Sequence, residues 1–298
     1  MSGTGTPAAH GGRSGYDAAA RHAAATVVEQ YSTSFARACR LLHEPVRTHV
    51  RAIYALVRVA DEVVDAPDLP LTAAQRRRHL DALEAATLEA MGTGFSTDLV
   101  VHAFALAARE HAITADLVAP FFASMRTDLD RASHDDASYD RYVHGSAEVV
   151  GLMCLRVFVG APDADDELRR DGYERLAPGA RRLGAAFQQV NFLRDLAADR
   201  DDLGRVYVPD VDPDHLTDRQ RDAVLDEVDD DLATAARAIA ALPPSSRRAV
   251  RAAHGLFAAL SHRLRATPAQ AIARGRVRVP APAKALVVAR TLLPAGRS

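Results

Sequence analysis

The feature that most constrains the fold is a polar stripe in the run from Phe187 to Pro209, FQQVNFLRDLAADRDDLGRVYVP. Gln188, Asn191, Asp195 and Asp199 follow one another there at steps of three, four and four residues. These steps place all four side chains on one face of an α-helix. Apolar residues between them, with no Pro or Gly before Gly204, predict that this helix forms. Two carboxylates and two carboxamides are costly to bury without a partner, and their oxygens suit a hard divalent cation, above all Mg²⁺. A solvated helix face is the alternative interpretation.

A second stripe has the same character. Tyr54, Arg58, Asp61 and Asp65 lie in YALVRVADEVVD at steps of four, three and four residues. They too share one helical face. If the two faces oppose each other, four carboxylates converge on one cavity and can hold several Mg²⁺ ions. Such a cluster is suited to grip a diphosphate and help it leave.

Composition predicts an all-α fold. The chain has 298 residues and is 48% hydrophobic, enough for one large helical domain or two small ones. Ala is abundant, whereas the residues that favour strands are sparse. We expect one domain over residues 16–298 after a disordered leader, residues 1–15, of mostly small and polar residues. The two cysteines, Cys39 and Cys154, argue against a disulfide framework and a Cys-rich zinc site, and fit a cytoplasmic setting.

Periodicity and punctuation predict where the helices lie. The first helix is expected over residues 16–42, and Pro45 is expected in the first turn of a helix that ends at Asp65. Pro178 is expected to open the helix that carries the first stripe. The remaining expected helices are 71–91, 97–112, 116–132 and 138–159, with loops at 66–70, 133–137 and 204–213 and two or three helices after them, broken at Pro243–Pro244 and near Pro268.

Charge is unevenly distributed along the chain. The net charge is −2, but Asp231 is the last acidic residue, and residues 232–298 carry twelve cationic side chains. This basic segment is a candidate for peripheral contact with an anionic membrane; pairing with acids on other helices is the alternative, which we place first. Nucleic acid is not an expected partner, since no recognition motif accompanies the charge. We expect no signal peptide and no membrane span, because no apolar run approaches the ~20 residues needed.

Five motifs in order along the chain carry a family resemblance. They are YSTSF at 31–35, YALVRVADEVVD at 54–65, YVHGSAEVVG at 142–151, QQVNFLRDLAAD at 188–199 and GRVYVP at 204–209. With them the chain resembles the squalene and phytoene synthase family of head-to-head trans-prenyltransferases, bacterial phytoene synthases most of all. The N-x-x-R-D-x-x-x-D piece followed by G-R-V-Y-x-P is specific, whereas a lone D-x-x-x-D is not.

The resemblance implies a single-domain, isoprenoid-synthase-like helical bundle with a central active-site cavity. It implies Mg²⁺-dependent joining of two geranylgeranyl diphosphates to 15-cis-phytoene through a cyclopropylcarbinyl diphosphate, with Mn²⁺ as an alternative ion. Squalene or dehydrosqualene synthesis from two farnesyl diphosphates and prenyl transfer to another acceptor are the alternatives. NADPH, which full reduction to squalene requires, is not expected. A non-catalytic helical partner protein is the last alternative, against which facing carboxylates argue.

The resemblance also implies roles for individual residues. The implied metal ligands are Asp61, Asp65, Asn191, Asp195 and Asp199. The implied catalytic residues are the four aspartates together with Tyr54 and Tyr142, whose rings would line the cation pocket. The implied substrate-binding residues are Tyr31, Ser32, Thr33, Ser34, Tyr54, Arg58, Gln188, Arg194, Arg205 and Tyr207.

Each of these roles has a structural alternative. Arg58 and Arg194 offer a fork of donors to diphosphate oxygens, or they pair with a neighbouring aspartate. Tyr207 has a structural role as an equal alternative, and serines near a helix end are ordinary caps. Glu148 and Leu256 stand where relatives often carry a small or neutral residue and a Tyr, so they bear on the shape of the pocket.

Overall fold

The computed structural model describes residues 12–31, 38–66, 68–280, 282, 285–287 and 289. Within these ranges the secondary structure is helical, apart from one isolated parallel β-bridge between Ser133 and Val206, so the all-α prediction is confirmed. The elements are α1 (Arg13–Tyr31), α3 (Val46–Asp65), α4 (Ala73–Thr93), α5 (Leu99–Glu110), α6 (Ala115–Asp130), α7 (Asp136–Val143), the π-helical turn η1 (His144–Glu148), α8 (Val149–Val159), α9 (Asp166–Leu203), the 3-10 turn η2 (Pro213–His215), α10 (Asp218–Ala240), α11 (Pro244–Arg265) and α12 (Ala269–Ile272).

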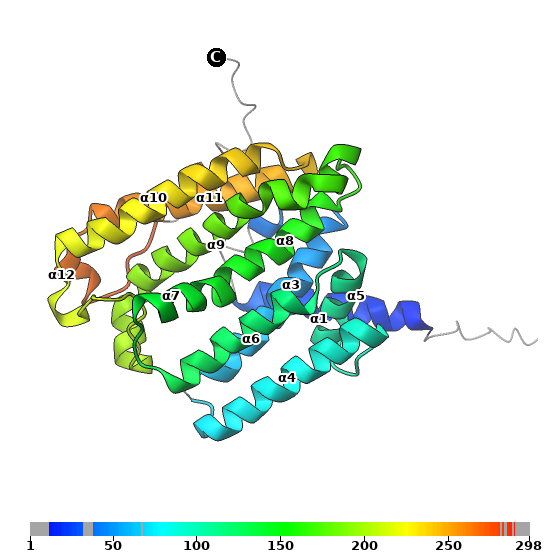
Figure 1. The fold of residues 1–298 in the computed structure, drawn as a ribbon, viewed down its shortest axis with the longest axis horizontal. Helices are drawn as coiled ribbons and strands as arrows, with labels where there is room; N and C mark the ends of the chain where they lie inside the picture. Colours follow the sequence, from blue (N-terminus) through cyan, green and yellow to red (C-terminus); the bar gives the residue numbers. More distant parts are fainter. Residues whose placement is uncertain are drawn as a thin grey trace, which may run out of the picture.

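Helix α9 is the element around which the others pack. It is 38 residues long and contacts α8, η1, α10 and α11. Figure 1 shows α10 and α11 along one side of the molecule and α4 along the other, with α9, α8 and α6 between them. The first stripe therefore lies on the helix that is most surrounded by others.

The prediction that Pro178 opens α9 is wrong. The helix begins twelve residues earlier, at Asp166, after Asp165 accepts a hydrogen bond from the Leu168 N–H (2.8 Å). Pro178 lacks an N–H and normally interrupts a helix interior, but tertiary packing overrides this preference. A Cβ on the adjacent Gly179 would lie 2.3 Å from the Ala238 Cβ of α10, so the two helices are held in very close contact at this point.

Other helix ends differ by a few residues from expectation. Helix α1 begins at Arg13, three residues before the expected start, and is described as far as Tyr31. Residues 1–11 and 32–37 lie outside the described ranges, and residues 40–42, which were expected to be helical, form a turn. Helix α3 ends at Asp65 as expected, but Pro45 is the residue before its first turn and not part of that turn. The polar loop expected over 133–137 is shorter, because Asp135 and Ser138 form a capping box that starts α7 at Asp136.

Glycines let η1 and α8 approach the neighbouring helices α6 and α9 closely. A Cβ on Gly145 would lie 2.2 Å from the carbonyl oxygen of Pro120 on α6. A Cβ on Gly151 would lie 2.6 Å from the carbonyl oxygen of Ala180, and one on Gly184 would lie 2.5 Å from that of Ala147. The glycines of the YVHGSAEVVG motif therefore serve helix packing.

One segment has the composition of a membrane span. Among the described residues, the continuous helical segment Asp136–Val159 is long and apolar enough to cross a bilayer. In its most apolar window 56% of the residues are buried within the protein, as in the core helix of a helical bundle. This segment comprises α7, η1 and α8, and it packs against α6 and α9.

Candidate active site

The polar stripe of α3 lies beside a buried apolar face. Ile53, Leu56 and Ala60 are at most 2% exposed, whereas Asp61 and Asp65 are only half-buried. The helix ends at Asp65, its last acidic residue, because Ala66 adopts an extended conformation (ψ 111°). Both aspartates are therefore carried by the last turns of α3, at its end.

The stripe of α9 has the same character. Gln188, Asn191, Asp195 and Asp199 are half-buried, while Val190 on the neighbouring face is fully buried. The prediction of one helix with a polar face is confirmed. The function of each of its side chains stays a prediction.

The two stripes influence each other electrostatically. Burial, followed by the charge of Asp65, raises the pKa of Asp61 to about 7. Burial, followed by the charges of Asp195 and Asp65, raises the pKa of Asp199 to about 7. The aspartates of α3 and α9 are thus close enough to repel, as the opposed-face hypothesis requires.

The loop after α9 returns over these carboxylates. Gly204 takes a left-handed conformation (φ 66°) that ends the helix and turns the chain. The Val206 N–H then donates to the Ala132 carbonyl (2.8 Å), next to the isolated β-bridge. Arg205, only 7% exposed, donates from Nη1 to Asp65 Oδ1 (2.7 Å), so the GRVYVP loop is tied to α3.

Asp128 of α6 is a residue that the sequence analysis missed. It is 8% exposed and accepts hydrogen bonds from the hydroxyls of Tyr142 (2.9 Å) and Tyr207 (3.1 Å). Burial raises the pKa of Asp128 to about 7, although Arg205 at 3.8 Å opposes the shift. The available signal was an acid at helical spacing from two core residues, Phe121 and Met125, which belongs to none of the recognised motifs.

Three aromatic rings line up beside Asp128. The rings of Phe192 and Tyr207 stack at 4.5 Å, and those of Tyr142 and Tyr207 at 5.1 Å. Burial raises the pKa of both tyrosines well above the ordinary value, so their hydroxyls stay protonated and donate to Asp128. The hydrogen bonds fix the two tyrosine rings in a buried aromatic stack beside Asp128.

The other predicted arginines are paired with acids. Arg58 binds Glu62 (2.5 Å), not the expected Asp61, and its guanidinium lies 4.6 Å from the centre of the Tyr31 ring. Arg194 forms a bidentate pair with Asp195, the neighbour expected by the structural alternative. Arg276 from the C-terminal segment, which was not predicted, also reaches Asp195 (Nε–Oδ1, 2.7 Å).

The remaining predicted residues are placed as follows. Tyr54 is half-buried on α3, on the face that carries the two aspartates. Tyr31 is 52% exposed at the end of α1. Ser32, Thr33 and Ser34 lie outside the described residues.

The residues present fit a hard divalent cation. The Asn191 Oδ1 atom is buried and has no hydrogen-bond partner among the described residues, so an acceptor faces the site unused. The carboxyls around it have raised pKa values that a nearby cation would lower. All five predicted ligands offer oxygen atoms, which Mg²⁺ and Mn²⁺ prefer.

Comparison with known proteins decides the family. The sequence profile of the squalene/phytoene synthase family matches residues 28–283. The chain belongs to this family.

Individual relatives are similar at modest identity. A phytoene synthase of Mycobacterium tuberculosis is 29% identical over 224 residues, which cover 71% of this chain and 66% of that protein. A 15-cis-phytoene synthase of Paracoccus sp. is 32% identical over 189 residues, which cover 61% of this chain and 57% of that protein. The aligned segments thus span at most 66% of these two relatives. A solved dehydrosqualene synthase shares the fold, with a TM-score of 0.74 at 16% identity over 93% of this chain and 96% of that chain.

The two departures from the family motifs lie in different places. Glu148 accepts hydrogen bonds from His144 Nδ1 and Arg181 Nε, both at 2.8 Å, and the three side chains line a hollow of about 630 Å³ with α10. Leu256 is half-buried on α11, next to Phe257, whose ring stacks on that of Phe187 at 3.8 Å. The hydrogen-bond partners of Glu148 are therefore His144 and Arg181, and neither of them belongs to the two acidic stripes.

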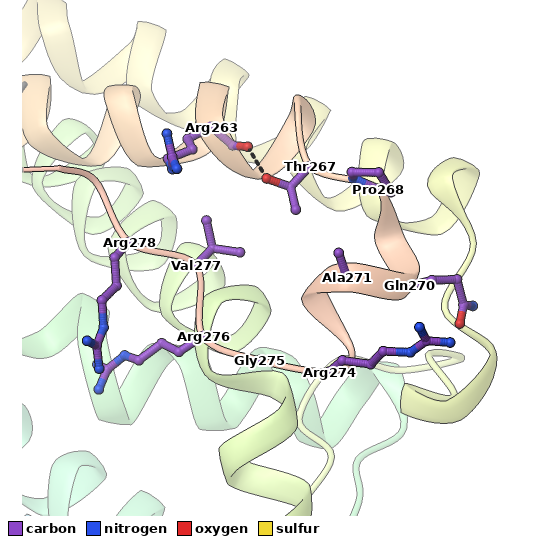
Figure 2. A pocket seen from close by; sticks show the side chains of 10 residues that line it. All are labelled: Arg263, Thr267, Pro268, Gln270, Ala271, Arg274, Gly275, Arg276, Val277 and Arg278. Carbon is purple, nitrogen blue, oxygen red and sulfur yellow. Dashed lines mark hydrogen bonds between the residues drawn. The ribbon is translucent and has the colours of Figure 1, made fainter.

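The basic C-terminal segment of this family member is partly explained by ion pairs. Arg265 binds Asp226 (2.8 Å) and Asp229 (3.0 Å) of α10, and Arg276 binds Asp195, as the structural alternative expected. A hollow of about 770 Å³ lies between the end of α11, α12 and the segment that follows, and Figure 2 shows the residues that line it. Its arginines are Arg263, Arg274, Arg276 and Arg278.

Proposed function

We propose that this chain condenses two molecules of geranylgeranyl diphosphate head to head, giving 15-cis-phytoene through a cyclopropylcarbinyl diphosphate. The curated relatives named as phytoene synthases support the choice of substrate. The observation that carries the proposal is that Arg205 links the two stripes, since its backbone N–H donates to the Asp199 carbonyl and its guanidinium binds Asp65. On the stripe of α9, Asn191 Oδ1 is a buried acceptor without a partner among the described residues. A diphosphate site that works through divalent cations needs several carboxylates close together to hold these cations. The end of α3 and the polar face of α9 supply such carboxylates.

The ligands for the cations would come from both helices. Asp61 and Asp65 of α3 would hold Mg²⁺ or Mn²⁺ together with Asn191, Asp195 and Asp199 of α9. When bound, the ions supply positive charge that stabilises the departing diphosphate. The protein contributes their position, because both stripes are fixed on packed helices.

Arginines would complete the diphosphate site. Arg205 is buried and already fixed by Asp65 and Tyr207, so its guanidinium is pre-positioned. Arg58 and Arg194 are half-buried and pair with acids on their own helices. We propose that they exchange these carboxylates for diphosphate oxygens, and that Tyr31, Ser32, Thr33, Ser34 and Gln188 contact the same substrate.

The aromatic cluster would protect the allylic cation. The π systems of Tyr142, Tyr207 and Phe192 would stabilise positive charge and exclude water. Asp128 orients both tyrosines by accepting their hydroxyl hydrogens. Tyr54 would line the same cavity from α3.

A shorter substrate is the alternative that one observation favours. The solved dehydrosqualene synthase covers 93% of this chain, so the same fold is compatible with a C30 product from two farnesyl diphosphates. Transfer of one prenyl group to another acceptor is the remaining alternative, motivated by Glu148 and Leu256.

The deciding experiment is an incubation of the full chain with Mg²⁺ and either geranylgeranyl or farnesyl diphosphate, with and without NADPH, followed by mass analysis of the hydrocarbon. We expect a C40 product from the longer substrate without NADPH. A C30 product would assign the enzyme to the dehydrosqualene or squalene branch, and NADPH dependence would choose between these two. Absence of hydrocarbon from both substrates would contradict the condensation.

Two variants test the metal ligands directly. Asp61→Asn and Asp195→Asn should abolish turnover and leave the helical circular dichroism unchanged. Asp201→Asn is the matched control, because Asp201 is exposed on α9 and pairs only with Arg200 in the described structure. Full activity in either of the first two variants would exclude the assignment.

The cellular setting is also a proposal. We propose a cytoplasmic enzyme in which arginines such as Arg263 and Arg274, which have no ion pair within the described residues, touch an anionic membrane surface. Binding to vesicles containing an anionic lipid, reversed by salt, would support this contact.

A further inference from the structure

A cluster of metal-ligating side chains lies outside the acidic stripes. It contains His49 of α3, Glu110 at the end of α5 and His111 directly after it. One ligand atom from each of the three lies within 4.8 Å of the other two. His111 Nε2 is 2.7 Å from His49 Nδ1, and carboxylate oxygens of Glu110 lie 3.3 Å from His49 Nε2 and 3.8 Å from His111 Nε2.

We propose that His49, Glu110 and His111 form a binding site for a divalent first-row transition metal of the zinc class, with a water molecule as the fourth ligand. This site is independent of the Mg²⁺ site and of the proposed reaction.

The ligand chemistry selects this class of ion. Imidazole suits zinc and its neighbours, whereas Mg²⁺ prefers oxygen donors only. Two imidazoles and one carboxylate are a known ligand set for four-coordinate zinc that keeps one position open. Zinc ligands lie 2.0–2.2 Å from the ion, so two of them are roughly 3.3–3.5 Å apart in a tetrahedron. One ion binds only one nitrogen of His49. The contact of His49 Nε2 with Glu110 (3.3 Å) is at this spacing, whereas His111 contacts the other nitrogen, Nδ1, at 2.7 Å. The ring of His111 would therefore have to shift toward Nε2 for all three residues to reach one ion.

The fold holds both imidazoles in place before any ion binds. His49 is 4% exposed in the second turn of α3, and its ring meets that of His111 at 63°. His111 is held at the end of α5 because Ala112 takes a left-handed conformation (φ 51°) and the Ile113 N–H donates to the Ala108 carbonyl (2.9 Å). Gly160 leaves room for the second ring, since a Cβ there would lie 2.8 Å from His111 Nδ1.

The charges around the cluster are compatible with a cation. Burial lowers the pKa of both imidazoles, that of His111 to about 4, so both rings are neutral and able to coordinate at neutral pH. Glu110 and Glu44 contribute negative charge, and Arg21 contributes one positive charge nearby. Glu110 is 52% exposed, which leaves the open side of the cluster accessible to solvent.

The position of the cluster separates it from the candidate active site. His49 precedes Asp61 by twelve residues on the same helix, a distance of about 18 Å along the axis. An ion at His49 would join the start of α3 to the end of α5. Its expected effect is stabilisation of the folded chain in proportion to RT ln(1 + [metal]/Kd).

The experiment is a titration of the metal-free full chain with Zn²⁺ by equilibrium dialysis, and with Co²⁺, whose visible absorption reports tetrahedral coordination. We expect one Zn²⁺ that persists in the double variant Asp61→Asn/Asp195→Asn. Glu110→Gln should lower the affinity for this Zn²⁺ by at least about tenfold. Because Glu110 is on the surface, the variant should fold as the wild type does, and thermal melting with and without Zn²⁺ will show whether it does.

The matched control is His102→Gln. His102 is fully buried on the same helix, α5, and pairs with Asp17 (2.8 Å), but it is not part of the cluster. Zn²⁺ binding unchanged in His102→Gln and lost in His49→Gln and His111→Gln would support the site. The proposal is overturned if Glu110→Gln and His111→Gln bind Zn²⁺ as the wild type does, or if the Asp61→Asn/Asp195→Asn variant binds no Zn²⁺. In either case His49 and His111 form only a hydrogen-bonded pair.

Discussion

Single residues of the candidate active site link metal binding to pH. The pKa of Asp61 and that of Asp199 are raised to about 7 by burial and by neighbouring carboxylates, from about 3.9 in an unfolded chain. Below about pH 7 these carboxyls hold protons that a metal ion must displace. We therefore expect Mg²⁺ affinity to fall and proton release to rise as the pH decreases from about 8 to 6, measured by calorimetry in buffers of different ionisation enthalpy.

The same shifts predict the stability of the metal-free chain. The pKa of each carboxyl is higher in the folded chain than in the unfolded chain, so the folded chain binds more protons between about pH 4 and 7. This proton binding stabilises the folded chain at low pH, and the stabilisation is lost as the pH rises through about 7. The melting temperature without Mg²⁺ should be higher near pH 6 than near pH 8. The Asp61→Asn/Asp199→Asn variant is the control and should reduce this difference in melting temperature. Equal Mg²⁺ affinity of the wild type at pH 6 and pH 8 would contradict the predicted coupling of Mg²⁺ binding to protonation.

Ala112 is a second residue whose conformation makes a prediction. Its φ of 51° is left-handed, which costs an alanine about 1 kcal/mol or more, whereas glycine adopts this conformation readily. The side chain is exposed, so removing it loses no buried contact. Ala112→Gly should raise the free energy of unfolding by about 0.5–1 kcal/mol in urea denaturation. A destabilised variant would mean that the turn after α5 is not left-handed in solution.

At the scale of helices, the close contact of α8 with α9 is open to test. The Cβ of Gly151→Ala would lie 2.6 Å from the backbone oxygen of Ala180, which cannot move away like a flexible side chain. We expect a loss of about 1–3 kcal/mol in the free energy of unfolding. Gly92→Ala on α4 is the matched control, because nothing lies within 4 Å of its Cβ. That change should raise stability by about 0.5–1 kcal/mol. Equal effects of the two substitutions would exclude tight packing at Gly151.

Helices were predictable where their signals are local. The stripe at Gln188, Asn191, Asp195 and Asp199 depends only on spacing along one helix, so its face was identified from the sequence. Pro178 was misread because the start of α9 is set twelve residues earlier by the cap at Asp165, and not by the local preference of proline for a first turn. The π-helical turn at His144–Glu148 interrupts α-helical periodicity without any Pro, and Gly145 is the residue in it that weakens the expectation of a continuous helix.

Contacts between helices were predictable only through the motifs. The nearness of Asp65 to Asp199 followed from assuming that two polar faces oppose each other. Asp128 and Arg276 belong to no recognised motif, and their partners Tyr142 and Asp195 lie on other elements. Side chains that complete a site from a third helix or from the C-terminal segment depend on packing, which spacing alone does not encode.

At the scale of the whole molecule, two large hydrophobic cores within the described residues meet along α9. One contains Leu168 and Leu176 of this helix together with side chains of α3, α5, α6 and α8. The other contains Leu193 and Leu196 together with side chains of α10 and α11. Arg205 connects these parts, since it follows α9 and binds Asp65 and the Val64 carbonyl (3.2 Å) at the end of α3. The candidate active site is therefore located where the two cores are joined.

This arrangement predicts that Arg205 stabilises the folded chain apart from any contact with substrate. Arg205→Gln removes the cation that faces Asp65 and the buried Asp128, and should lower the free energy of unfolding by about 3 kcal/mol, the lower end for a broken buried ion pair because Asp65 is partly exposed. Arg200→Gln, five residues earlier, breaks more exposed pairs with Asp201 and Asp214 and should cost at most about 1 kcal/mol. Urea denaturation followed by circular dichroism, without Mg²⁺ or substrate, measures both. If Arg205→Gln is no less stable than Arg200→Gln, Arg205 does not connect the cores. If Arg205→Gln is destabilised as predicted, Mg²⁺ should restore part of the lost free energy of unfolding, because a bound cation would again neutralise the same carboxylates.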